Sequence, residues 1–82
     1  MKEPGPAEHI DELRREASRI ADMAAEASRH HEAGAYADAA LVLGLLHYRF
    51  TAAMAASAAA IDAIRDEHGV TPDDALRWMG HA

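Results

Sequence analysis

Residues 39–61 read AALVLGLLHYRFTAAMAASAAAI, and Arg49 is the only formally charged residue among them. Apolar side chains at helical spacing cover three sides of this region rather than one. The three stripes are Tyr36, Ala40, Leu43, His47, Phe50, Met54, Ser57, Ile61 and Ile64; Leu41, Leu45, Tyr48, Ala52, Ala55 and Ala59; and Ala39, Val42, Leu46, Ala53, Ala56 and Ala60. A surface helix of a monomer shows one such stripe. The stretch therefore predicts a helix that is buried from several directions.

The same stretch approaches the length of a membrane span. However, His47 and Arg49 lie near its middle, where a charge is costly, and its second half is mostly alanine, which is weakly hydrophobic. The first ten residues carry Pro4, Pro6 and acidic side chains in place of a secretory signal. We expect a cytoplasmic protein with no membrane partner.

A second helical pattern precedes this stretch. Its apolar positions alternate in steps of three and four, as in one stripe of an amphipathic helix. They are Ile10, Leu13, Ala17, Ile20, Ala24, Ala27 and His31. Gly34 and Gly69 supply helix stops, which predicts helices over about 7–33 and 36–68. A short turn between two long helices makes them antiparallel neighbours, and Gly34-x-Tyr36-x-x-Ala39 resembles the turn of tetratricopeptide-type helix hairpins.

The two ends of the chain are predicted separately. Residues 1–6, MKEPGP, predict a disordered leader because of their prolines and glycine. Thr71 as N-cap and Pro72 at the first helical position predict a short helix over 72–80, with Leu76 and Met79 on one face, folding back onto the hairpin. We therefore expect one all-α domain over 7–82, a long antiparallel helical hairpin plus a short C-terminal helix.

Length and composition favour association. A single core in 82 residues is marginally stable alone, and without cysteine there are no disulfides to support it. Two antiparallel helices would leave two stripes of the second helix uncovered. We expect a homo-oligomer, most simply a dimer forming a four-helix bundle, with trimers and hexamers as alternatives. The expected interface is the second stripe, Leu41, Leu45, Tyr48, Ala52, Ala55 and Ala59. Gly44, in mid-helix, suggests that another backbone approaches closely there.

Several function classes lack sequence support. The net charge of -6 opposes binding to a nucleic-acid backbone. Ser18, Ser28 and Ser57 have no base and acid at suitable spacing, and no glycine-rich phosphate loop is present, so we expect neither catalysis nor a cofactor. The histidines read as surface and helix-capping residues, because no Glu-x-x-His pair is repeated, and we expect no metal site.

Arg49 is the residue that most needs a partner, because burying an unpaired guanidinium is expensive. A structural explanation is an acidic residue of the first helix, such as Asp22 or Glu26, or exposure on a wet edge. A functional explanation is an anionic ligand. Arg49 would bind it through two hydrogen bonds, His47 would donate a further hydrogen bond, and Tyr48 or Phe50 would stack on a base of the ligand.

Two hypotheses of function follow. The first is a non-enzymatic homo-oligomer that captures an anionic, nucleotide-like small molecule or an acidic protein segment near His47, Tyr48, Arg49 and Phe50. The alternative is a protein–protein assembly, adaptor or inhibitor module, of phage or mobile-element type, in which Arg49 is structural.

Overall fold

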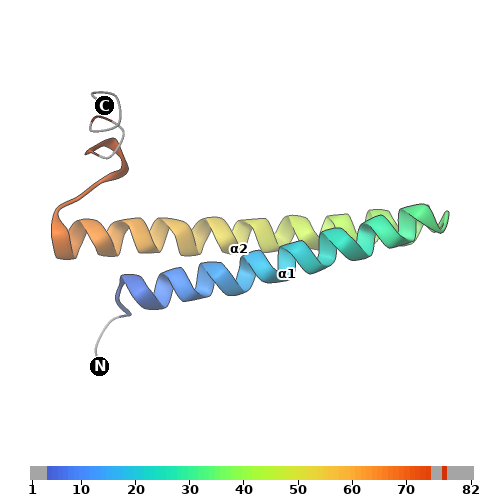
Figure 1. Ribbon diagram of the computed structural model, residues 1–82, viewed down its shortest axis with the longest axis horizontal. Helices are drawn as coiled ribbons and strands as arrows, with labels where there is room; N and C mark the ends of the chain where they lie inside the picture. The colour runs from blue at the N-terminus through green and yellow to red at the C-terminus, as the bar shows by residue number, and fades with distance from the viewer. Residues whose placement is uncertain (1–3, 75–76, 78–82) are drawn as a thin grey trace.

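The computed structural model describes residues 4–74 and 77. Two long helices, α1 (Pro6–Glu32) and α2 (Tyr36–His68), lie side by side in opposite directions, and residues 69–74 leave the hairpin at an angle (Figure 1). The described residues contain no strand. The fold is thus an all-α helical hairpin, as predicted.

The turn between the helices is a Schellman motif, which explains where α1 ends. Gly34 takes a left-handed conformation, with φ of 78°. The Ala35 N–H donates to the His30 carbonyl at 2.8 Å, and the Gly34 N–H donates to the His31 carbonyl at 3.0 Å. Beside the turn, the rings of His31 and Tyr36 meet edge to face, with centroids 5.4 Å apart.

The other helix ends are also set by local chemistry. Pro6 is the first residue of α1, and the Gly5 N–H donates to the Glu8 carboxylate at 2.9 Å. Gly69, with φ of 67°, ends α2. After it, the Thr71 N–H donates to the Asp74 carboxylate at 2.9 Å, and residues 72–74 begin a helical turn. Leu76 and Met79, which we expect to complete that helix, lie outside the described residues.

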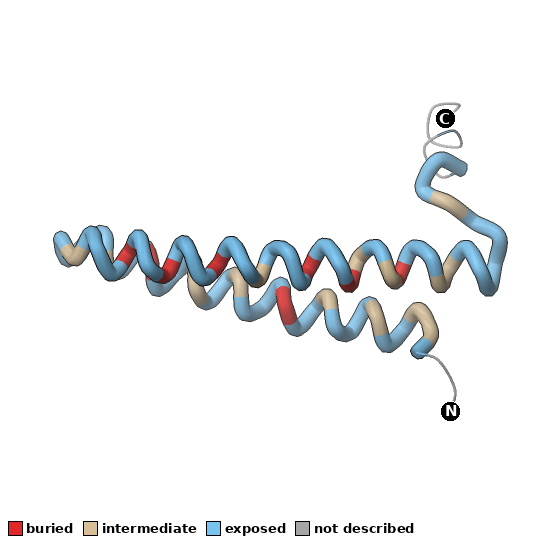
Figure 2. Tube along the Cα trace, turned by 180° about the vertical axis from the view of Figure 1, so that it is seen from behind, coloured by how far each residue is buried: buried red, intermediate tan, exposed pale blue. Residues whose placement is uncertain are grey.

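The two helices meet along a narrow seam. Figure 2 shows the buried residues of α2 along the side that faces α1. These residues form the third stripe of the sequence pattern, Ala39, Val42, Leu46, Ala53, Ala56 and Ala60. From α1, alternating steps of three and four bring buried and half-buried residues to this seam, namely His9, Leu13, Glu16, Ile20, Met23, Ala27 and His30.

The seam of α1 differs from the predicted one in every second position. Leu13, Ile20 and Ala27 face α2 as expected, whereas Ile10, Ala17, Ala24 and His31 are exposed. Their places are taken by the residues one position earlier. The physical reason is that the apolar and small residues of α1 cover more of its circumference than one seam needs, so α1 can turn about its axis. The observed orientation brings the carboxylate of Glu16 within reach of Arg49.

Candidate functional site

Arg49 lies on the side of α2 that faces α1, where it meets an acidic residue. Its Nη1 is 3.6 Å from Oε1 of Glu16, and Nη1 of Arg19 is 3.4 Å from the same oxygen. The partner is therefore Glu16 and not Asp22 or Glu26, which are exposed. A structural ion pair, one of the explanations open from the sequence, accounts for the only formal charge in the central part of α2.

The Glu16 side chain is the most deeply buried charged group of the described residues. Only 5% of it is exposed, against 43% for Arg49. Its second carboxylate oxygen, Oε2, is buried and has no hydrogen-bond partner among residues 4–74 and 77. Breaking such a pair leaves a buried charge uncompensated, which is far costlier than losing a surface ion pair. The Glu16–Arg49 pair therefore favours the observed alignment of the two helices.

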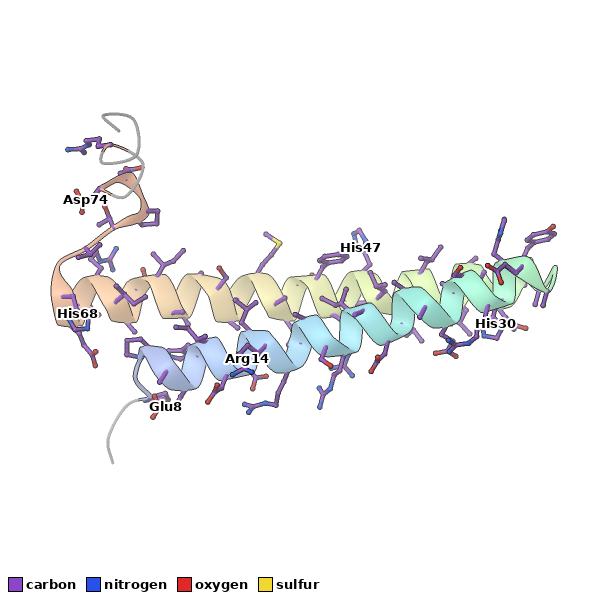
Figure 3. All side chains as sticks on the ribbon, viewed as in Figure 1. Glu8, Arg14, His30, His47, His68 and Asp74 are labelled. Carbon is purple, nitrogen blue, oxygen red and sulfur yellow. The ribbon has the colours of Figure 1, made fainter. Side chains whose placement is uncertain are left out.

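The four residues predicted to form an anion site do not converge. His47 projects away from α1 (Figure 3), and it lines a shallow hollow with Tyr48, Gly44 and Thr51. Successive residues of an α-helix are about 100° apart. As a result Arg49 lies on the opposite side of α2 from this hollow, and Phe50, half of it exposed, faces a third direction.

Gly44 borders the same hollow. In the part of the chain that the structure describes, no atom outside the local helix lies within 4 Å of the position that a Cβ on Gly44 would take. The close approach of another backbone, expected from the sequence, therefore does not come from the hairpin itself.

The predicted interface stripe lies on the exposed part of α2. Leu41, Leu45 and Tyr48 are 63%, 50% and 78% exposed. Ala52 and Ala55 are exposed and Ala59 is half-buried. The first stripe is exposed as well, since Leu43, Phe50 and Met54 are 52%, 49% and 71% exposed. Two apolar stripes of α2 thus face solvent along the hairpin.

Sequence reasoning missed the contribution of α1 to this surface. It placed Ile10, Ala17 and Ala24 against α2, but the structure exposes all three. The signal that could have found them is that α1 has apolar or small residues both in its seam and in the row directly beside it.

The histidines and acids of the hairpin are spread over its length rather than gathered in one place. Among the described residues, no three His, Asp or Glu side chains lie together as metal ligands would. His30 contacts Glu26 at 3.5 Å, and His68 contacts Glu67 at 3.6 Å. A shallow hollow at the open end of the hairpin has His9 on one side and three acids of α2 on the other, Asp62, Asp66 and Glu67.

By length and composition, α2 could cross a membrane. One helix of this kind is weak evidence for a membrane protein, because the core helix of a soluble protein meets the same criterion.

Comparisons with protein-family models, with curated proteins and with solved structures find no match for this chain.

Proposed function

We propose that this protein is a non-enzymatic assembly module, a homo-oligomer in which helices of other copies cover the outward side of α2. The observation that carries the proposal is the exposure of large apolar side chains between positions 41 and 54 of that helix. They include Leu41, Leu43, Leu45, Tyr48, Phe50 and Met54, each about half exposed or more. Monomeric soluble proteins rarely expose contiguous apolar patches larger than a few hundred Å².

The shape of the subunit supports the same proposal. The whole chain has 6393 Å² of accessible surface, whereas a compact monomer of 8.8 kDa has about 4,800 Å². Its radius of gyration is 17.2 Å, against about 12 Å for a compact domain of this length. The excess surface, about 1,600 Å², is twice the area of about 800 Å² that each partner buries in a stable complex of standard size.

A dimer that forms a four-helix bundle is the simplest closed assembly of two hairpins. Covering α2 with protein gives its apolar sides an alternative to lipid, and the Glu16–Arg49 pair at mid-helix suits a protein interior better than a bilayer centre. We therefore include a cytoplasmic location in the proposal, with the protein itself as its main partner and no nucleic acid.

The experiment is sedimentation velocity combined with thermal unfolding, each over a hundredfold range of protein concentration. We expect an oligomer whose unfolding midpoint rises with concentration, because dissociation accompanies unfolding. A folded monomer that stays soluble and helical across the whole range would contradict the proposal.

Binding of an anion is the second candidate, favoured by the hollow that His47 and Tyr48 share. The geometry supports it less, because Arg49 already pairs with Glu16. Thermal melts with a panel of nucleotides and inorganic anions, run on wild type and on His47→Ala, separate the two candidates. A midpoint raised by one anion in the wild type alone would favour ligand capture.

A further inference from the structure

We propose that the second copy docks on one particular face of the hairpin, and that this face differs from the stripe predicted from the sequence. The inference rests on the proposed self-association and specifies its geometry. The face, called here the uncharged face, consists of two rows of residues that flank the seam on the same side. They are Ile10, Ala17 and Ala24 of α1, and Leu43, Phe50 and Ser57 of α2.

The contact between His31 and Tyr36 shows that the two rows share a side. Their rings are 5.4 Å apart. Steps of seven residues lead back from His31 to Ala24, Ala17 and Ile10, and forward from Tyr36 to Leu43, Phe50 and Ser57. Both helices keep seven-residue spacing in their seams, as in Leu13, Ile20 and Ala27 of α1 and in Ala39, Leu46, Ala53 and Ala60 of α2. Rows that start on one side of such a seam remain on that side.

Charge distinguishes the two sides of the hairpin. The rows of the uncharged face hold no Asp, Glu, Lys or Arg. The corresponding rows on the other side hold Glu12, Arg19 and Glu26 from α1, and Asp38, Leu45, Ala52, Ala59 and Asp66 from α2. Arg19 is moreover engaged with Glu16. Covering that side with a partner would remove charged groups from water, which opposes association unless each is paired.

Residue size makes the uncharged face self-complementary. Within one subunit, the steps of seven place Leu43 beside Ala24, Phe50 beside Ala17, and Ser57 beside Ile10. Each large side chain therefore lies next to a small one, so the face alternates between raised and lowered positions.

A two-fold axis parallel to the long axis of the hairpin would set α2 of one copy across α1 of the other. Leu43 then meets the partner's Ala24, Phe50 meets the partner's Ala17, and Ile10 meets the partner's Ser57. Large meets small at every position, as close packing requires. A two-fold axis perpendicular to the helices within the interface plane would instead set α2 on α2 in opposite directions, and an axis at the middle of the row would place Phe50 against its own copy.

Leu43→Lys and Leu45→Lys form a matched pair that tests the face. The two leucines belong to one helix and are 52% and 50% exposed, but they lie on opposite sides of the seam. We expect sedimentation velocity to show Leu43→Lys shifted to monomer at concentrations where wild type and Leu45→Lys remain associated. Circular dichroism checks that both variants stay helical.

The outcomes separate this inference from the proposed function. If Leu45→Lys dissociates and Leu43→Lys does not, or if the two behave alike, the assignment of the face is wrong while self-association stands. If the wild type is monomeric at every concentration, the proposed function fails first.

Cysteine cross-linking tests the axis even if a lysine variant does not fold. The chain has no cysteine, so Ala17→Cys and Phe50→Cys each introduce a single thiol. We expect an equimolar mixture, oxidised after subunit exchange, to give mainly the mixed disulfide, identified by mass spectrometry, and little of either homodimer. Mixed product at or below the random half would contradict the proposed axis.

Discussion

The two sides of α2 are built in opposite ways. The side that packs on α1 is lined mostly by alanine, with Val42 and Leu46 as its largest apolar residues. The side that faces solvent carries Leu, Tyr, Phe and Met. In a monomer that folds alone, the larger side chains occupy the interior, because burying each is worth about 1.5–3 kcal/mol. The difference teaches that the contacts within the hairpin bring the helices close together, while the larger apolar side chains of α2 stay exposed on its outer side.

The largest effect is expected at Arg49, the charged residue on the side of α2 that packs on α1. Arg49→Met leaves Glu16 buried with Arg19 as its only nearby cation, and should lower the free energy of unfolding by about 2–3 kcal/mol. The double variant Glu16→Leu, Arg49→Met should recover most of that loss, because an apolar pair often replaces a buried ion pair without cost. Urea unfolding at one fixed subunit concentration measures both. A double variant no more stable than Arg49→Met would mean that the pair contributes through something other than its charge.

The next effect contrasts two alanines on opposite sides of α2. Ala53 is 9% exposed in the seam, whereas Ala55 faces solvent. Ala53→Leu inserts volume where the helices touch and should cost about 1–3 kcal/mol. Ala55→Leu should change stability by no more than about 0.5 kcal/mol. Equal losses of stability at both positions would show that the two sides of α2 do not differ in how tightly they are packed.

A smaller effect, with an informative sign, is expected at Gly44. Space is open around it within the chain, so Gly44→Ala should stabilise by about 1 kcal/mol through helix propensity alone. Thermal unfolding at one fixed protein concentration measures the change. A destabilised variant would show that another copy packs its backbone against this position. Gly34→Ala is the control, and it should destabilise because φ there is 78°.

The smallest effect is expected at a solvent-exposed contact on α1, between Glu12 and Arg15. A hydrogen bond from Arg15, 2.7 Å long, together with its positive charge, holds the pKa of Glu12 below its usual value. The stability that this contact contributes is present above the pKa of Glu12 in the unfolded chain and is lost as the pH falls through its lower folded pKa. The difference in urea midpoint between wild type and Glu12→Gln should therefore shrink between pH 7 and pH 3. A difference that stays constant would exclude this contact as its cause.

The hairpin was predictable because its signals are local. Gly34 and Gly69 both adopt the left-handed conformation that ends a helix, and the buried stripe of α2 matches one of three stripes in the sequence. The alignment of the helices was harder to predict. An acidic residue such as Glu16 is ordinarily placed on the wet side, so the sequence pattern put Ala17 in the seam instead. The partner of Arg49 was then sought at Asp22 and Glu26, because no local rule fixes how two helices slide against each other.

The candidate site was less predictable for the same reason. His47, Tyr48, Arg49 and Phe50 are adjacent in sequence, but a helix distributes four consecutive residues around its circumference. The choice among three apolar stripes also depends on which one α1 covers, and a single helix pattern does not contain that information.

The hairpin is only one helix layer deep, with Cα atoms spanning 14 Å along the shortest axis. So shallow a body buries little of its own apolar surface, and under the proposed assembly the hairpin reaches its full stability only when it meets another copy. The cellular concentration of the protein would then control how long each chain survives. Newly made chains remain open to proteases while they are scarce, and they become long-lived once synthesis raises their concentration above the dissociation constant.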